Sequence, residues 1–393
     1  MNKQRSSTTL IGVLFFFTFL TYGNVDKPES TSDGFYELKT IAEFKITKNR
    51  GPILLPVTFI EKDLLFILDT GSSLTVYDTS LRHELGKVKR IEKALTHGGL
   101  IKTEIFDAPD AFLGPLNLKD SNEVSCLDLK MLSLIEGRKI SGIIGLNFLK
   151  RYVIQIDFDQ GTLLFLEPLG EQHPEWGIEL PLRYDTKGWP QIIGNIPDGA
   201  KVKFVIDTGA TGAAGSLDNM IFEEILSKKE IKTSESLSAT ASGIVRSREI
   251  RVSNLSVGAF KYDQLIFGEA NWSHLGLSFL SRHIVTFDFP NSRLYLKKGK
   301  DFKKRDETDM SGLHLLRISG NTVVYSVDEG SPAQKAGIGP KDIILKVDEK
   351  DAHKYDMWEL RLLLMSEDKR YITMTIKHGD ELKEISFLLK KMI

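Results

Sequence analysis

Two aspartates lie in the same short motif, and two carboxylates in such a setting can share acid–base chemistry. Residues 66–71 read Phe-Ile-Leu-Asp-Thr-Gly and residues 204–209 read Phe-Val-Ile-Asp-Thr-Gly, which places Asp69 and Asp207 at matching points. An Asp between an apolar run and Thr-Gly lies on a tight turn, where backbone amides and hydroxyls can bond its carboxylate. One such triplet usually marks only a capped turn, so it is the second copy that favours a shared site.

The two triplets belong to a longer internal repeat. Residues 145–158 read GLNFLKRYVIQIDF and residues 276–289 read GLSFLSRHIVTFDF. Over the 22 aligned positions that begin at Gly145, 8 residues are identical. Two matches in the same order along the chain indicate duplicated lobes rather than chance similarity.

Between these matches each copy has a glycine-bearing segment, around Gly99 in the first and Gly243 in the second, with the alternation typical of a hairpin. Short β-type runs fill the rest of each copy, and residues 220–226 are expected to form a short helix. The stretch before the second match is 13 residues longer in the first copy, because 114 to 145 spans 31 positions and 258 to 276 spans 18. The sequence therefore predicts two mainly β lobes with one frame and different loops.

Pseudo-two-fold packing of two such lobes would bring Asp69 and Asp207 together at the axis. Like charges at that distance cannot both ionise cheaply, so the pair holds one proton between its members. The ionised carboxylate can then deprotonate a water molecule while the protonated one donates to a peptide carbonyl oxygen. This pairing predicts hydrolysis of peptide bonds.

These residues resemble the pepsin and retropepsin superfamily of aspartic proteases. The family signature combines an apolar-Asp-Thr-Gly segment with an apolar-apolar-Gly element, here 68–71 with 143–145 and 206–209 with 274–276. The resemblance covers roughly residues 40–298 and implies Asp69 and Asp207 as the catalytic dyad. It further implies residues that support the dyad, namely Thr70, Gly71, Ser72, Thr208 and Gly209, and flap candidates at Gly98, Gly99 and Gly243.

The chain departs from the family pattern at three points. Neither flap segment contains a tyrosine, which favours flaps of the glycine-rich retropepsin kind. Ser72 follows the first triplet but Ala210 follows the second, so we expect a hydroxyl donor on Asp69 that Asp207 lacks. Fewer hydrogen bonds to a carboxylate raise its pKa, which predicts an activity optimum nearer neutral than in pepsin-like enzymes. His274 replaces an aliphatic residue, which puts the packing of the second element in question.

After residue 298 the sequence pattern changes. Residues 299–308 are polar with mixed charge and are expected to be a linker whose basic cluster is solvated. Residues 330–337 read GSPAQKAG, in which Ser331 suits an N-cap, Pro332 the first helical position and Gly337 the helix end. A strand over 342–347 is predicted to follow.

This C-terminal run resembles a PDZ domain of the kind attached to bacterial exported proteases, over about residues 309–391. The resemblance implies a loop that binds a peptide C-terminal carboxylate, with the peptide added as a strand beside 315–318 and a helix near 358–365 as the second wall. The residues of that loop are Gly312, Leu313, His314 and Leu315. Lys341 and Glu349 stand where such domains usually have glycine. The alternative is that the module only packs against the lobes.

The N-terminus has the pattern of an export signal. Lys3 and Arg5 precede an uncharged stretch whose apolar centre, residues 10–20, is shorter than the about 20 residues a membrane span needs. We expect a signal peptide over residues 1–23 and an exported protein, in the bacterial periplasm or outside the cell. The second choice is an uncleaved anchor, which is the one case in which a membrane would be a partner.

The composition excludes several other classes of function. The chain has 393 residues, 52 Lys+Arg against 53 Asp+Glu and a formal net charge of -1, so no broad basic surface favours nucleic acid. A single cysteine, Cys126, excludes intrachain disulfides and multi-cysteine metal sites. No metal site, cofactor, phosphate-binding loop or serine-hydrolase elbow is predicted.

The sequence thus predicts a mainly β fold: two homologous retropepsin-like lobes in a bilobal acid-protease arrangement, then a small α+β PDZ domain. The expected divisions are a signal peptide (1–23), first lobe (24–180), second lobe (181–298), linker (299–308) and PDZ domain (309–393). The predicted function is an aspartic endopeptidase acting on peptide or protein substrates, with protein C-termini at the PDZ groove. The alternative is a catalytically silent peptide-binding or scaffold protein that uses both grooves.

Overall fold

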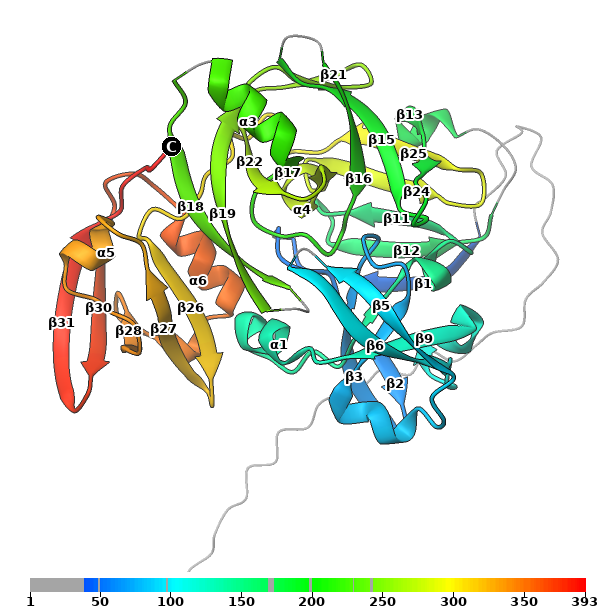
Figure 1. Cartoon of the computed structure of the whole chain (residues 1–393), viewed down its shortest axis with the longest axis horizontal. Helices are drawn as coiled ribbons and strands as arrows, with labels where there is room; N and C mark the ends of the chain where they lie inside the picture. The colour runs from blue at the N-terminus through cyan, green and yellow to red at the C-terminus, as the bar shows by residue number, and fades with distance from the viewer. Residues whose placement is uncertain are drawn as a thin grey trace, which may run out of the picture. The chain divides into compact units, whose positions relative to one another are not determined.

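The computed structural model describes residues 39–393 except 49, 97, 169–172, 198–199, 229 and 241–242. The predicted signal peptide, residues 1–23, lies outside the described residues. Strands dominate the described chain and form four sheets (Figure 1). Within these ranges, no helix combines the length and the apolar character that crossing a bilayer requires.

The first lobe is a nine-stranded sheet whose strands lie in the order β5-β6-β9-β4-β10-β3-β2-β7-β8. The apolar alternation of its strands buries one face, as in β2, whose inward residues are fully covered. The strands are β2 (Leu54–Phe59), β3 (Lys62–Leu68), β4 (Thr75–Asp78), β5 (Arg90–Thr96), β6 (Gly99–Asp107), β7 (Phe112–Leu113), β8 (Leu116–Asn117), β9 (Glu123–Leu127) and β10 (Gly142–Ile144).

The second lobe repeats this order strand for strand, as β18-β19-β22-β17-β23-β16-β15-β20-β21. The duplicated frame is therefore present in the topology as well as in the sequence. The strands are β15 (Pro190–Asn195), β16 (Lys201–Ile206), β17 (Gly215–Asp218), β18 (Thr233–Thr240), β19 (Gly243–Val252), β20 (Leu255–Val257), β21 (Phe260–Tyr262), β22 (Leu265–Ala270) and β23 (His274–Leu275), with β14 (Arg183–Tyr184) paired to β15.

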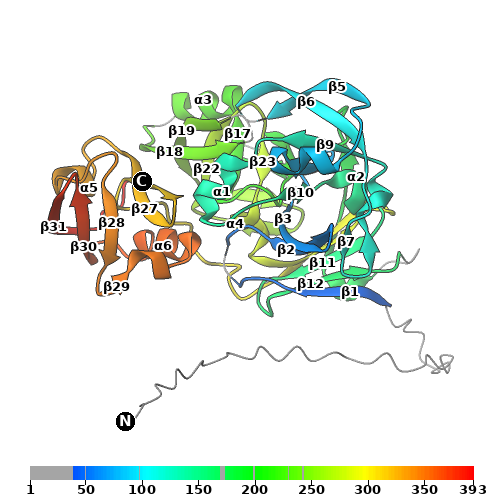
Figure 2. The same ribbon diagram turned by 90° about the horizontal axis from the view of Figure 1, so that it is seen from below.

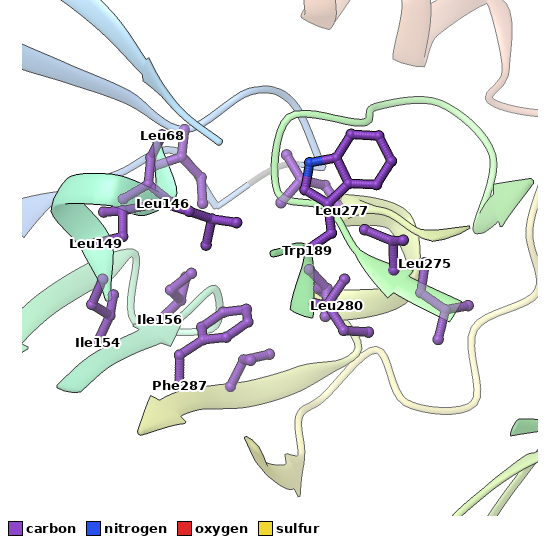
Figure 3. Packing of buried hydrophobic residues seen from close by; sticks show 14 of the residues in the cluster. Leu68, Leu146, Leu149, Ile154, Ile156, Trp189, Leu275, Leu277, Leu280 and Phe287 are labelled. Carbon is purple, nitrogen blue, oxygen red and sulfur yellow. The ribbon is translucent and has the colours of Figure 1, made fainter. Parts of the chain in front are cut away.

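A six-stranded sheet joins the two halves in the order β1-β12-β11-β24-β25-β13. Its central pair, β11 and β24, comes from the two copies of the second repeated segment and runs antiparallel, with Gln155 opposite Thr286. Apolar side chains from both copies pack together beside it, including Ile156 and Phe287 (Figure 3). The strands are β1 (Thr40–Lys45), β11 (Val153–Asp157), β12 (Thr162–Leu166), β13 (Ile178–Pro181), β24 (His283–Asp288) and β25 (Arg293–Lys298).

Helices are few and short in both lobes. α2 (Leu146–Leu149) and α4 (Leu277–Leu280) occupy equivalent places, directly after the two apolar-apolar-Gly elements. The predicted helix over 220–226 is present as α3 (Asn219–Lys228). α1 (Lys130–Glu136) lies between β9 and β10, in the stretch that is longer in the first copy, and the described second lobe has no helix at that place. Short 3-10 turns occur at Thr79–Glu84, Leu118–Ser121 and Pro174–Trp176 in the lobes and at Ala352–Lys354 in the C-terminal domain.

The C-terminal domain has its own sheet and its own apolar core. Its strands lie in the order β26-β27-β28-β30-β31, with β26 at the edge that faces α1. The elements are β26 (Leu313–Ile318), β27 (Asn321–Val327), α5 (Pro332–Lys335), β28 (Ile343–Val347), β29 (Lys350–Asp351), α6 (Met357–Leu364), β30 (Tyr371–His378) and β31 (Glu381–Leu388).

The predicted helix start in the C-terminal domain is confirmed. The Ser331 side chain accepts a hydrogen bond from the Gln334 amide and caps α5, as predicted. Lys341, which stands where related domains have glycine, adopts a φ of 74° and so carries backbone strain. Glu349 is not in the left-handed region; the preceding Asp348 is, with a φ of 50°.

Residues 299–308 are anchored to the second lobe rather than free of it. Asp306 is 2% exposed and accepts hydrogen bonds from Arg50, Arg282, Ser278 and the Ile266 amide. The basic side chains of 303–305 are exposed, in line with a solvated cluster.

Candidate active site

Each Asp-Thr-Gly triplet follows a buried central strand. β3 ends at Leu68 and β16 ends at Ile206, and the next residue in each case is the aspartate. The Asp69 amide donates to the Ile144 carbonyl and the Asp207 amide donates to the Leu275 carbonyl, both at 3.0 Å. The apolar-apolar-Gly elements of the repeat therefore lock the two turns in the same way.

The threonines tie the two turns to each other. The Thr70 hydroxyl donates to the Ile206 carbonyl at 2.6 Å, and the Thr208 hydroxyl donates to the Leu68 carbonyl at 2.9 Å. Each hydroxyl also accepts the backbone amide of the opposite threonine at 3.0 Å. Both threonines are buried, so these four bonds fix the separation of the aspartates without competition from water.

Both carboxylates are held by the same kind of donor. Asp69 Oδ1 accepts the amides of Gly71 and Ser72 at 2.7 and 3.1 Å, and Asp207 Oδ1 accepts those of Gly209 and Ala210 at 2.9 and 3.2 Å. The expectation of a serine hydroxyl on Asp69 was wrong.

The Ser72 hydroxyl donates instead to the Leu74 carbonyl at 2.8 Å, because the turn brings that acceptor within reach. Ser72 supports the dyad through its backbone amide, as Ala210 does in the second lobe. The two surroundings are therefore more alike than the side chains suggest.

The two carboxyls lie close together, with Asp207 8% exposed and Asp69 partly buried. Burial, followed by the charge of Asp207 and the bond to it, raises the pKa of Asp69 well above its usual range, against the opposing amide bonds. Burial also raises the pKa of Asp207, and the bond from Asp69 and two amides oppose this rise. Because the amide donors are matched, we assign the retained proton to the pair rather than to one member.

The glycines of the triplets allow this close approach. A Cβ at Gly71 would lie 2.6 Å from Asp207 Cγ, and a Cβ at Gly209 would lie 2.4 Å from Asp69 Cγ. Each turn therefore packs its glycine directly against the opposite carboxyl.

We expect Gly209→Ala to lower kcat for peptide hydrolysis by at least about tenfold, because the methyl group must displace the Asp69 carboxyl from its partner. Steady-state cleavage of an unfolded protein would measure this. Gly339→Ala is the matched control, since a Cβ there meets nothing within 4 Å. Equal activity of the two variants would contradict the close contact.

His274 is accommodated without disturbing the second element. It is 8% exposed, and its ring Nδ1 lies 2.7 Å from the Ser216 hydroxyl. Burial lowers the pKa of His274 to about 4, so the imidazole is neutral near pH 7. β23, which contains it, still pairs with β16.

The dyad opens into a cavity of about 1380 Å³. The hairpins β5–β6 and β18–β19 contribute to its walls, and the predicted flap glycines lie at their turns, where Gly99 and Gly243 share a φ of 118°. Gly98 is exposed at the first turn. The hairpins that carry the flap candidates thus contribute to the cavity that contains Asp69 and Asp207, whereas Gly98, Gly99 and Gly243 are not among its lining residues.

Several residues that line the cavity were not identified from the sequence. The rings of Trp189 and Trp272 lie with their centroids 5.1 Å apart and their planes tilted by 37°, and Lys187 Nζ lies 4.6 Å from the Trp189 ring centroid. The C-terminal domain also lines the cavity, through Trp358 and Arg361 among others. These residues are far apart in sequence and follow no local pattern.

The predicted carboxylate loop of the C-terminal domain is internally bonded. Asp309 Oδ1 accepts the amides of Ser311 and Gly312 at 2.8 and 2.6 Å, and the Ser311 hydroxyl accepts the Leu313 amide at 3.0 Å. His314 Nε2 lies 2.7 Å from Asp328 Oδ1. The amides of Gly312 and Leu313 thus already have acceptors.

The described residues hold no group of histidine, cysteine, aspartate and glutamate side chains that could bind a metal ion. Cys126 is buried, and burial raises the pKa of its thiol to about 11. A thiol in that state is a small core side chain rather than a nucleophile.

Comparison with known families gives two matches. Residues 55–148 match the aspartyl protease family, and residues 299–389 match the PDZ domain family. The first match covers the lobe that contains Asp69. With the repeated strand order, the two matches confirm the predicted fold class: two homologous retropepsin-like β lobes followed by a small α+β PDZ domain.

Some curated proteins are similar to part of the chain. Probable CtpA-like serine proteases of Staphylococcus aureus strains COL and N315 are 30% identical to it over 81 residues, or 21% of this chain and 16% of each relative. The match therefore spans less than a fifth of those relatives. A solved photosystem II D1 C-terminal processing protease aligns over 24% of this chain and 26% of its own, with 19% identity and a TM-score of 0.22.

Proposed function

We propose that this protein is an aspartic endopeptidase that cleaves peptide bonds with water activated by Asp69 and Asp207. The observation that carries the proposal is the close pair of carboxyls, with raised pKa values, inside a cavity large enough for a peptide. The aspartyl protease match over 55–148 supports it. The partly similar proteins are named as serine proteases, but here the Ser72 hydroxyl donates to the Leu74 carbonyl, and the Ser216 hydroxyl beside His274 donates to the Trp272 carbonyl.

The reaction follows from one proton shared by two carboxyls. The ionised member takes a proton from water as the water oxygen bonds to the peptide carbon, and the protonated member donates to the carbonyl oxygen. The proton taken from water then passes to the amine nitrogen as the C–N bond breaks. A hydroxyl of the tetrahedral carbon returns its proton to the other carboxyl, so the products are a carboxylic acid and an amine, and the pair again holds one proton. Thr70 and Thr208 keep the carboxyls at a fixed separation during this exchange.

The test is cleavage of an unfolded protein, such as reduced and carboxymethylated α-lactalbumin, from acid to neutral pH. We expect internal cuts that a statine-containing hexapeptide blocks and a serine-reactive phosphonate does not, because statine mimics the tetrahedral intermediate of water attack. No cleavage by folded protein would favour the silent peptide-binding protein. The reverse inhibitor pattern would reject the aspartic type.

The pH dependence should report the raised pKa values of the pair. Activity needs one ionised and one protonated carboxyl, so raising the pKa values moves the active window upward from about pH 4, the ordinary aspartate range. We therefore expect kcat/KM to peak between mildly acid and neutral pH. A peak at strongly acid pH would contradict this.

A further carboxyl of the same cavity, that of Glu249, would add its own titration to the pH profile of the activity. Burial raises the pKa of Glu249 to about 7, and this side chain lines the cavity on β19. Glu249→Gln removes its titration while the dyad is unchanged. If kcat/KM of this variant still changes near neutral pH, that change reports the titration of the dyad.

We do not extend the proposal to capture of free C-termini by the PDZ domain. The amides of Gly312 and Leu313, which such a carboxylate would need, are already bonded to Asp309 and Ser311.

The signal-like sequence of residues 1–23 supports action outside the cytoplasm, which fractionation of tagged full-length protein would test.

A further inference from the structure

Helix α1 connects the substrate cavity to the PDZ domain. It contacts β26 and α6, which are the two walls of the PDZ groove, and also β18 at the edge of the second lobe's sheet (Figures 1 and 2). In the described residues it has no equivalent in the second repeat. A peptide that added to β26 would run beside this same edge strand, where α1 already lies.

Polar contacts from α6 and its cap hold the C-terminal end of α1. Arg361 Nη2 donates to the Ile135 carbonyl at 2.6 Å, which satisfies one of the helix's free C-terminal acceptors. Arg138 forms an ion pair with Asp356, the N-cap of α6. A guanidinium on the last carbonyls of a helix is also favourable to the helix dipole.

The chain turns away from α1 through a tightly packed glycine. Gly137 has a φ of 71°, and a Cβ at this position would lie 2.6 Å from Met357 Cγ, the first residue of α6. The same Cβ would lie 3.4 Å from Arg317 Cβ on β26. The backbone after α1 therefore lies against both groove walls, at a closeness that a glycine permits.

The same helix forms a wall of the cavity that contains the dyad. Apolar side chains from α1 and from the PDZ domain line this cavity: Leu132, Ile135, Leu316, Trp358, Leu364 and Met365. Trp358 is 5% exposed, and its indole N–H has no acceptor among the described residues. A backbone carbonyl of a bound peptide would supply that acceptor.

We infer that α1 occupies the PDZ groove and that the PDZ domain is a fixed wall of the substrate cavity, with Arg361 as the residue that positions α1. This inference rests on the proposed endopeptidase function and names its substrate class. The substrate is an extended, unfolded polypeptide whose apolar side chains reach beyond the dyad to the α1–PDZ wall. The groove then serves specificity without a free C-terminus as its ligand.

The test compares full-length wild type with Arg361→Met, Arg361→Lys and the control Arg370→Met. Arg370 pairs with Asp348 inside the PDZ domain, and none of its hydrogen bonds within the described part of the chain reaches α1. Two probes are used: unfolded carboxymethylated α-lactalbumin, which can span the cavity, and a much shorter statine-containing hexapeptide, whose statine is centred on the dyad.

We expect Arg361→Met to raise KM for the unfolded protein about tenfold with kcat within twofold, and to leave the hexapeptide inhibition constant within twofold. Arg361→Lys should restore part of the loss, and Arg370→Met should match wild type. Equal effects on both probes, or no effect on either, would overturn the inference. If Arg361→Met unfolds the PDZ domain, Leu132→Asp makes the same comparison with Arg361 intact.

Amide hydrogen exchange separates this inference from the proposed activity. Exchange in residues 130–137 should rise at least tenfold in Arg361→Met while β30 and β31 stay protected. If the wild type cleaves nothing, the endopeptidase proposal fails. In that case fluorescence anisotropy with labelled α-lactalbumin still decides whether Arg361→Met weakens binding, and unchanged binding would reject the inference.

Discussion

Asp207→Asn is expected to abolish cleavage of an unfolded protein, with a fall in kcat of at least about 10³-fold. The amide keeps the shape of the carboxyl and the two backbone bonds from Gly209 and Ala210 can rearrange around it. What is lost is the shared proton, because an amide cannot exchange protons with Asp69. Residual cleavage is measured by mass spectrometry of the fragments.

The same variant should be more stable than wild type at neutral pH. A carboxyl whose pKa is raised by folding stabilises the protein when protonated, and this contribution is lost as pH rises through the folded pKa. Both dyad carboxyls are of this kind, so removing one relieves a cost at pH 7. A thermal midpoint that is equal or higher, together with lost activity, rules out unfolding as the cause.

Asp63→Asn is the control for this experiment. Asp63 lies on β3, the strand that leads to Asp69, and accepts a bond from Thr58 at the exposed end of that strand. Cleavage should be unchanged. Wild-type activity in Asp207→Asn would remove the dyad from the mechanism.

Asp306→Ala should lower the free energy of unfolding by about 3–5 kcal/mol, the largest stability effect expected here. Asp306 neutralises two buried guanidiniums, because Arg282 has a 1% exposed side chain and Arg50 a 15% exposed one. Burial lowers the pKa of Arg50, and Asp306 opposes that shift. Without the carboxylate Arg282 loses its carboxylate partner in the buried network, and Arg50 keeps only the longer contact with Asp301.

Differential scanning calorimetry should show this as a fall in the melting temperature of roughly 10 °C. Asp301→Ala is the matched control in the same segment, since Asp301 lies 4.0 Å from Arg50 and its side chain is 32% exposed. We expect that control to cost less than about 1 kcal/mol. Similar melting temperatures for the two variants would show that the buried network contributes little.

The dyad could be predicted because its signal is local and occurs twice. Asp69 and Asp207 are separated by 138 positions, but each carries its own triplet, and the duplicated frame implies where they meet. The first helix of the PDZ domain could be predicted for the same reason, since Ser331, Pro332 and Gly337 mark its start and end by their own conformational preferences.

Other features depend on partners that no local pattern identifies. Arg50 and Asp306 are 256 positions apart, and the mixed-charge surroundings of Asp306 suggested a solvated linker. The Ser72 hydroxyl had two acceptors within reach, and the turn geometry decides between them. The cavity wall formed by α1 and the PDZ domain needs a helix from the first lobe and a groove more than 170 positions later.

The pairing of β11 with β24 has a consequence for how this protein can vary. A cleft built from two identical subunits would repeat every insertion on both sides, and would carry two PDZ domains competing for one entrance. Fusion of both halves into a single polypeptide frees each half to acquire its own additions. α1 is such an addition, present on one side of the cleft, and it gives the enzyme a direction: one end of a bound polypeptide meets the PDZ wall and the other end does not.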